Sequence, residues 1–443
     1  MLFCGVKSVS NIKAATIWLI LACALTISAP ATTIVVTNTN DNGPGSLRQA
    51  LVDANDRDTV DATGVSGTIT LTSGQFLVDK SVIINGAGAD VLALDGNATS
   101  RVFQTVTGAK TVSISGLTIR NGQSGFGGSI LNAGIATLTI INSTLSGNAA
   151  GFGGGVFNSG TLIIINSTLS SNMASEGGGI YNSGSGMLTI TNSTFSGNAA
   201  SETGGGVFNI GTLQLANGTV SDNSAAFLAG GVLNFNNLEI GNTILNRGAS
   251  GVSIYSNGDG LVTSLGYNIS SDDGSGILTG PGDQINTDPL LGPLQHNGGP
   301  TFTHALLHGS PAIDAGDPNF TPPPFHDQRG PGFDRVRNGR IDVGSFEVQA
   351  GTTPTPTPTA TSSPTPTATF TPTPIPTATH TLTLTPIATR TPTPTATATA
   401  TPSATATATA TPSPTATASP RPTPSPRDTP APRSRPTPVP RPA

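Results

Sequence analysis

Residues 137–160 read TLTIINSTLSGNAAGFGGGVFNSG, and close copies of this segment follow directly. The copies are TLIIINSTLSSNMASEGGGIYNSGSG at 161–186, MLTITNSTFSGNAASETGGGVFNIG at 187–211 and TLQLANGTVSDNSAAFLAGGVLNFNN at 212–237, with a weaker copy, TVSISGLTIRNGQSGFGGSILNAG, at 111–134. Self-similarity at a fixed period indicates a repeat architecture, in which each copy forms one unit that stacks on the next. The stretch 111–246 therefore decides the fold.

Two sets of asparagines mark the period. The first Asn of each NST or NGT occurs at Asn142, Asn166, Asn192 and Asn217, in steps of 24, 26 and 25 residues. The Asn that follows each glycine run occurs at Asn132, Asn158, Asn182, Asn209 and Asn234, in steps of 26, 24, 27 and 25 residues. The length differences fall in the Ser-, Ala- and Glu-containing segments before the glycines. We expect these segments to be loops, because loops absorb insertions at little cost.

Each copy contains three short runs with strand character. TLTII and TLIII alternate β-branched and aliphatic residues, and STLS and GVF are shorter apolar runs. Alternation with period two is typical of strands, and no window carries a helical apolar stripe long enough for a helix. We therefore predict an all-β fold, a right-handed parallel β-helix (a solenoid) with about 25 residues per coil. The repeat itself does not fix the hand; the right hand is expected from the general preference of parallel crossovers, and a family resemblance implies it as well.

In-register stacking places equivalent residues above one another, about 4.8 Å apart. We expect one interior column from Ile130, Val156, Ile180, Val207 and Val232, and another from Leu138, Leu162, Leu188 and Leu213. We also expect both asparagine sets to form ladders at the turns, in which each amide bonds the next. This scaffolding accounts for a chain with 55 Gly and only 10% charged residues without any reaction centre.

An aromatic-rich column accompanies the interior ones. It contains Leu131, Phe157, Tyr181, Phe208 and Leu233, and alternation places it opposite the Val/Ile column. One interpretation is a surface strip, formed by Phe157, Tyr181 and Phe208, that binds sugar or protein partners. The other is that the rings pack beneath a neighbouring loop.

The chain divides into five segments. They are a signal peptide at 1–31, an N-terminal strand and capping helix at 32–66, the β-helix coils at 67–250, irregular last coils and a C-terminal cap at 251–350, and a Thr/Pro/Ala-rich tail at 351–443. In the second segment, GSLRQALVDAN (45–55) is amphipathic, and Ser46 and Gln49 have capping-box spacing. We expect this helix to cover the end of the solenoid, which otherwise exposes apolar columns and unpaired strand edges.

The first segment has the features of a cleaved secretory signal. Two lysines precede an apolar run from 14 to 28, and a small-residue cleavage site follows at 29–31. The alternative is a lipoprotein signal ending at Cys23. We predict a secreted or cell-surface protein with no transmembrane span in the mature chain. Cys4 and Cys23 both lie in the signal, so we expect no disulfide in the folded protein.

The body and the tail differ in charge and composition. Residues 32–350 carry 23 acidic and 11 basic side chains, which disfavours nucleic-acid binding. The tail is almost entirely Thr, Pro, Ala and Ser with six Arg and one Asp, and such a chain cannot bury a core. We predict a disordered, extended stalk, the alternative being a linker with no specific role. A further hypothesis is that its basic end adheres to an anionic envelope polymer.

Several motifs carry a family resemblance. GSLRQALVDAN with GTITL (67–71), SVIINGAGA (81–89) and ISGLTIRNG (114–122) resembles secreted bacterial right-handed parallel β-helix proteins of the pectate-lyase-like superfamily, and its helix resembles their CSLREA-type N-terminal segment. GGGVFN, GGGIYN and FSGN resemble the GGAI and FxxN repeats of chlamydial polymorphic outer-membrane proteins. DPLLGPLQHNGGPTFTHALLHGSPAIDAG (288–316) resembles the C-terminal region of choice-of-anchor-type β-helix proteins. The resemblance covers about 32–348 and implies an architecture, not an activity.

Ionisable side chains are concentrated between 288 and 347. They include Asp288, His304, His308, Asp314, Asp317, His326, Asp327, Arg329, Asp334 and Asp342. One interpretation is a calcium or sugar site in the C-terminal cap. The other is a structural cap, in which Asp314, Asp327 and Asp342 hydrogen-bond turns and pair with Arg329, Arg335 or Arg340. Apart from this possible calcium, we expect no cofactor.

We expect a monomeric, non-catalytic module, adhesin-like or structural in the cell envelope, whose partners are surface glycans or envelope polymers. The alternative is a polysaccharide lyase or glycoside hydrolase of the same superfamily, which needs convergent carboxylates. Only Glu176 and Glu202 occupy the same segment one coil apart. Acids and a basic residue converging in one groove favour the enzyme, whereas flanks of Asn, Ser, Thr and Gly favour the module.

Overall fold

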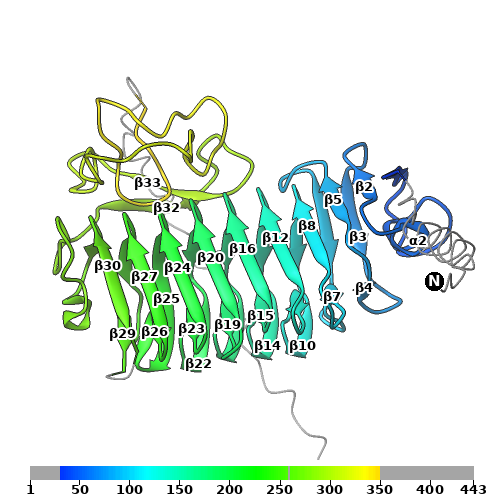
Figure 1. The fold of residues 1–443 in the computed structure, drawn as a ribbon, viewed down its shortest axis with the longest axis horizontal. Coiled ribbons are helices and arrows are strands. Elements are labelled where there is room, and N and C mark those ends of the chain that lie inside the picture. The colour runs from blue at the N-terminus through cyan, green and yellow to red at the C-terminus, as the bar shows by residue number, and fades with distance from the viewer. Residues whose placement is uncertain (1–29, 258–259, 350–443) are drawn as a thin grey trace, which may run out of the picture. The chain divides into compact units, whose positions relative to one another are not determined.

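The computed structural model describes residues 30–257 and 260–349. The predicted signal peptide, apart from its last two residues, and the predicted tail at 351–443 lie outside the described residues. The described chain winds as a parallel β-solenoid, in which each coil adds one strand to each of several sheets (Figure 1). Equivalent residues of successive repeats pair in register; Thr137, for example, lies between Thr111 and Thr161.

Sheet A has ten strands. In order they are β1 (Thr33–Val35), β2 (Thr59–Ala62), β5 (Ile83–Gly86), β8 (Thr111–Ser115), β12 (Thr137–Ile141), β16 (Thr161–Ile165), β20 (Met187–Thr191), β24 (Thr212–Ala216), β27 (Asn237–Gly241) and β30 (Val262–Gly266). Every pair in this sheet is parallel, as expected where the chain returns to the same side after each coil.

Sheets B and C form the other two sides. Sheet B contains β3 (Gly67–Thr70), β6 (Leu92–Asp95), β9 (Thr118–Arg120), β13 (Thr144–Ser146), β17 (Thr168–Ser170), β21 (Thr194–Ser196), β25 (Thr219–Phe227), β28 (Ile244–Arg247) and β31 (Ile269–Ser270). Sheet C contains β4 (Phe76–Val78), β7 (Phe103–Thr105), β11 (Ile130–Asn132), β15 (Val156–Asn158), β19 (Ile180–Asn182), β23 (Val207–Asn209), β26 (Ala229–Asn234) and β29 (Val252–Ser256).

The segments before the glycines form a further ladder, here called sheet D. It contains β10 (Gln123–Phe126), β14 (Ala149–Phe152), β18 (Met173–Glu176) and β22 (Ala199–Thr203), and it joins sheet B through β25. The prediction that these segments are loops was wrong, because their backbone groups pair with the equivalent segment one coil away. The length differences appear as register shifts between β18 and β22 and between β22 and β25.

The interior columns are confirmed. Ile130, Val156, Ile180, Val207 and Val232 are fully buried, and Leu138, Leu162, Leu188 and Leu213 are at most 1% exposed. Each member contributes on the order of 1.5–3 kcal/mol by removal of its side chain from water. Glycine is required where coils approach closely: a Cβ on Gly154 would lie 2.4 Å from the carbonyl oxygens of Gly178 and Met173.

Helical structure is scarce among the described residues. The one α-helix among the described residues, α2 (Leu47–Asp53), begins where the sequence predicts, and the Ser46 hydroxyl accepts a hydrogen bond from the Gln49 backbone amide at 3.1 Å. Leu47, Ala50 and Leu51 are buried in the same apolar cluster as the first coils. A single 3-10 turn, η1, spans Gly274–Gly276. No described helix has the length and apolar character needed to cross a membrane.

The cap (residues 288–349) lies against the outer side of sheet B. It contains an antiparallel pair, β32 (Leu291–Gln295) and β33 (Thr303–Leu306), and is otherwise irregular (Figure 1). Its own apolar cluster joins Leu306, Ala312, Val343 and Phe346 to Ile244 of β28. This cap therefore covers one end of sheet B and leaves the strands from β3 to β13 uncovered on that side.

Candidate functional site

One asparagine set forms a continuous amide ladder. Amide nitrogens donate to the next amide oxygen at 2.8 Å from Asn132 to Asn158 and from Asn158 to Asn182, and at 2.7 Å from Asn182 to Asn209 and from Asn209 to Asn234. All five side chains are fully buried. They hold the turn after sheet C together and offer no surface to a ligand.

The set at Asn142, Asn166, Asn192 and Asn217 differs from the predicted ladder. Among these four described residues, only Asn192 and Asn166 share an amide–amide bond, at 3.1 Å. All four have φ between 48° and 55°, a left-handed conformation that Asn tolerates better than most residues. Their shared role is the turn between sheets A and B. Two of them also bind the cap: the Asn192 amide donates to the His326 carbonyl, and the Asn217 oxygen accepts from Arg335.

A second complete ladder escaped the sequence analysis. Amide groups link Asn148 to Asn172 and Asn172 to Asn198 at 2.9 Å, and Asn198 to Asn223 at 2.8 Å. These residues end LSGN, LSSN, FSGN and VSDN, and they recur in steps of 24, 26 and 25 residues. The same period that marked the other two sets would have identified this one.

The predicted aromatic strip forms a file of parallel rings on the outer side of sheet C. The ring centroids of Phe157 and Tyr181 are 5.2 Å apart at 5° between planes, and those of Tyr181 and Phe208 are 4.8 Å apart at 7°. Phe208 is only 8% exposed, whereas the other two rings are half-buried. Successive rings cover part of each other's faces, so the file offers mainly ring edges to a partner.

A second aromatic pair, from sheet D, lies over this file. Phe126 and Phe152 stack with centroids 5.3 Å apart, and each contacts the file edge-on, Phe126 with Phe157 and Phe152 with Tyr181. Such contacts contribute roughly 0.5–1.5 kcal/mol each beyond burial. Phe126, 48% exposed, is the most exposed of these five rings. The rings of the file thus pack beneath a neighbouring segment, as the second interpretation expected, and Phe126 alone of these rings is exposed.

A groove of about 360 Å³ lies over sheet B where the cap ends. Its floor is formed by outward-facing side chains of β9, β13 and β17, mainly Thr118, Thr144, Ser146 and Ser170. One wall is Phe302 of the cap, 47% exposed, and the other is the turn at Asp90. In-register pairing spaces the floor hydroxyls evenly along the groove.

The charged groups at this groove are largely committed to each other. The Arg120 Nε donates to Asp95 Oδ2 at 2.9 Å, and the Asn121 amide donates to the same oxygen. Burial tends to raise the pKa of Asp95, but hydrogen bonds from the Asn97 backbone, Asn121 and Arg120 lower it on balance. A carboxylate held ionised in this way is a poor general acid.

Glu176 and Glu202 are the other candidate pair. They lie on the neighbouring strands β18 and β22 of sheet D, beside the aromatic file. Partial burial, with a smaller contribution from the Glu202 charge, raises the pKa of Glu176. The raised pKa is a property that a general acid requires.

In the cap, Asp327 and Arg329 form a buried ion pair. Arg329 Nε and Nη2 both contact Asp327 Oδ2, at 3.0 and 2.5 Å, and neither side chain is exposed by more than a few per cent. The guanidinium lies between the rings of Phe333 and Phe346, at 3.9 and 3.8 Å from their centroids. This part of the predicted structural cap is a packed ion pair. Arg340, the third predicted partner, instead donates to the carbonyls of Ala315 and Gly316.

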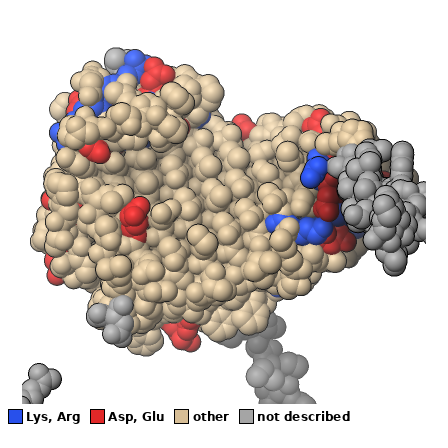
Figure 2. Space-filling model, viewed as in Figure 1, with Lys and Arg blue, Asp and Glu red and all other residues tan. Residues whose placement is uncertain are grey.

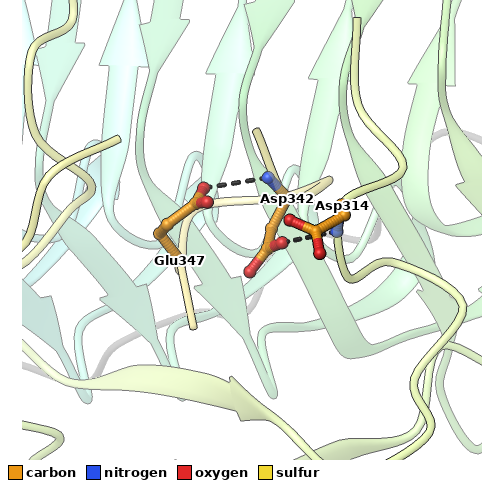
Figure 3. A group of neighbouring side chains, drawn as sticks. All are labelled: Asp314, Asp342 and Glu347. Atoms are coloured by element: carbon orange, nitrogen blue, oxygen red, sulfur yellow. Dashed lines mark hydrogen bonds between the residues drawn. The ribbon is translucent and has the colours of Figure 1, made fainter. Parts of the chain in front are cut away.

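Three further carboxylates, those of Asp314, Asp342 and Glu347, lie together in the cap (Figure 3). One oxygen from each lies within 4.8 Å of the others. Burial, followed by the Asp342 charge, raises the pKa of Glu347 to about 9, and burial raises that of Asp342 to about 6. Among the residues that the structure describes, this is the one cluster with the donor atoms of a metal site. Sequence analysis named the two aspartates but missed Glu347.

A scan of the chain against protein-family models found no match. A search against curated protein sequences found no significant similarity.

Proposed function

We propose that this protein is a non-catalytic β-helix module of the cell surface or the extracellular space, which binds an extended neutral polysaccharide in the groove across sheet B. The observation that carries the proposal is the lining of that groove. A row of Thr and Ser hydroxyls faces one half-exposed aromatic wall, Phe302. The Thr118 hydroxyl already donates to the Ala89 carbonyl and can only accept from a ligand. Hydroxyls beside an apolar ring match the hydroxyl edges and C–H faces of a sugar.

The charge distribution supports a neutral ligand. Arg120 is neutralised by Asp95, and the remaining carboxylate at the rim, Asp90, repels an acidic chain. In Figure 2, which looks onto sheet A, charged side chains gather mainly towards the two ends of the visible face and are sparse between them. A flank of Asn, Ser, Thr and Gly is the pattern expected of a binding module rather than an enzyme.

Binding can be tested with the full chain on an array of neutral and acidic glycans. We expect binding to a neutral polysaccharide that changes little between low and high salt, since no net charge is involved. Phe302→Ala should weaken binding about tenfold, because one stacking contact of ~1 kcal/mol or slightly more is lost. Phe325→Ala, which removes a ring that is 67% exposed elsewhere in the cap, is the matched control. Equal affinity of both variants and the parent chain would show that the polysaccharide does not bind in this groove.

The rival function is a carbohydrate-active enzyme of the pectate-lyase-like superfamily. The observation in its favour is the raised pKa of Glu176 beside Glu202. The same polysaccharides should therefore be incubated with the protein and assayed for new reducing ends and unsaturated products. Product formation that Glu176→Gln abolishes would replace the binding proposal with a catalytic one.

The wider assignments rest on the sequence motifs alone. We infer a right-handed β-helix of the pectate-lyase-like superfamily, secreted as a monomer through the segment 1–31, with the tail 351–443 as its stalk. Adherence through the basic end of the tail predicts that deletion of 420–443 moves the protein from the cell fraction to the medium. An unchanged distribution argues against that role for the tail.

A further inference from the structure

The carboxylate cluster of the cap joins two segments that are distant in sequence. Asp314 lies in the turn after β33, and Asp342 and Glu347 lie in the last described segment (Figure 3). Asp342 Oδ1 accepts from the Asp314 backbone amide at 2.7 Å, and Glu347 Oε2 accepts from the Asp342 amide at 2.9 Å. Asp342 Oδ2 also accepts from the Val348 amide at 2.6 Å, so backbone amides hold both oxygens of Asp342 and one oxygen of Glu347.

One oxygen in this cluster has no partner. Glu347 is fully buried, yet its Oε1 makes no hydrogen bond in the described structure. A buried carboxyl oxygen without a partner is costly, typically ~1–3 kcal/mol, so native proteins rarely keep one without a ligand. The carboxyl group to which it belongs places an oxygen within 4.8 Å of an oxygen of Asp342 and of Asp314.

The cluster also has an excess of negative charge. The nearest buried cation, Arg335, directs its Nη2 to the carbonyls of Asp342 and Gly344 and makes no ion pair within 4.0 Å among the described residues. Asp327 is already neutralised by Arg329. Without a cation the raised pKa keeps Glu347 protonated; once a cation draws off that proton, three carboxylates against one guanidinium leave about two negative charges, which a divalent cation neutralises.

We propose that Asp314, Asp342 and Glu347 bind a calcium ion that fastens the end of the chain onto the cap. All donors are carboxylate oxygens, which hard cations prefer, and the group contains no His or Cys for zinc. Calcium takes ligands at about 2.3–2.6 Å, so ligand oxygens on one ion lie up to about 5 Å apart. The separation of no more than 4.8 Å fits this range. The site is independent of the glycan groove.

Calorimetry of the full chain tests the proposal. Protein stripped with chelator is titrated with CaCl₂ and, separately, with MgCl₂, and its thermal unfolding is followed. We expect a binding heat for calcium and a rise in Tm of about 5 °C once free calcium exceeds the Kd about 100-fold. We expect a smaller response to magnesium, which demands a tighter octahedral shell.

Two near-isosteric variants separate the site from general salt effects. Glu347→Gln and Asp314→Asn should each abolish the calcium-dependent rise in Tm; Asn is suited to position 314, where φ is 52°. Asp334→Asn removes an exposed carboxylate of the same cap and should keep the rise. The absence of a calcium response in the parent chain, or a response that survives in both site variants, overturns the proposal. Circular dichroism at 20 °C confirms that each variant is folded before titration.

Discussion

The regular coils from 111 to 246 and the cap from 288 to 349 bury polar groups in opposite ways. In the coils, every buried polar side chain is Asn, Ser or Thr, and the asparagines of the two complete ladders bond their own copies one coil away. In the cap, the buried polar side chains include charged ones: Asp327, Arg329, Arg335, Asp342 and Glu347. The chain thus buries neutral polar side chains in its coils and ionisable ones in its cap.

The contrast arises because, in the coils, each buried side chain stacks on the equivalent side chain of the next coil and must be able to hydrogen-bond with it. An amide carries both a donor and an acceptor, so a file of asparagines satisfies itself at every repeat. A file of carboxylates or guanidiniums cannot, because like charges repel and each group is acceptor-only or donor-only. Where repetition ends, polar groups need unlike partners, and the cap supplies opposite charges. The following predictions test this contrast, from the largest expected effect to the smallest.

Breaking the buried ion pair of the cap should cause the largest loss of stability. Arg329→Ala leaves Asp327 buried without its partner and removes the guanidinium between Phe333 and Phe346. We expect the free energy of unfolding of the cap to fall by about 3–5 kcal/mol, measured by urea unfolding. Arg337→Ala removes an exposed arginine 3.9 Å from Asp334 and should cost less than about 1 kcal/mol. Similar losses in the two variants would contradict the distinction.

Interrupting an asparagine ladder in the coils should cause a somewhat smaller loss of stability. Asn172→Ala interrupts a ladder, since Asn172 accepts from Asn148 and donates to Asn198 and to the Leu145 carbonyl. The buried groups left unpaired should lower the free energy of unfolding by about 2–3 kcal/mol. Asn236→Ala, at an exposed position, should change it by less than about 0.5 kcal/mol. If urea midpoints shift equally, the ladder does not stabilise the coils.

The smallest expected change in stability concerns the contact between the cap and the coils. His304 of the cap is buried between the Ser196 hydroxyl and the Gly292 carbonyl, at 2.9 and 2.7 Å. Burial lowers the pKa of His304, although the Gly292 carbonyl and the Asp222 charge oppose the shift. The folded state therefore favours neutral histidine, and its contribution is present above the unfolded pKa of about 6.5 and is lost as pH falls through the lower folded pKa.

We accordingly expect the cap to lose on the order of 1 kcal/mol between pH 7 and pH 5, measured by thermal unfolding at each pH. His304→Gln should be less stable at pH 7 but should lose this part of the pH dependence. His308→Gln, at an exposed position of the same cap, should keep it. A parent chain that becomes more stable on acidification over this range would reverse the assigned sign.

Repetition explains which features were predictable. The columns through Val156 and Leu162 follow directly from the 25-residue period, because in-register stacking fixes each neighbour. The period also marked Asn142 and Asn166, but it did not reveal that their left-handed φ, rather than a ladder, gives them their role. Loops and the stacked strands of sheet D have similar compositions, so the composition of these segments did not reveal that they form strands. The prediction of loops was therefore wrong.

The sites were less predictable, for the same reason. Glu347 has no copy in another coil, and only the path of the cap brings it to Asp314 and Asp342. Likewise, Phe302 and Thr118 are 184 positions apart and share a groove only because the cap ends over β17.

The sequence by itself determined the all-β solenoid, its period and its neutral, ladder-filled interior, because identical segments can pair in only one register without losing their columns. The tertiary structure alone decided where the cap settles, which carboxylates meet and where the groove opens. Those outcomes depend on single contacts between unlike segments, such as Thr219 with Ser345, and no repeated pattern in the sequence encodes them.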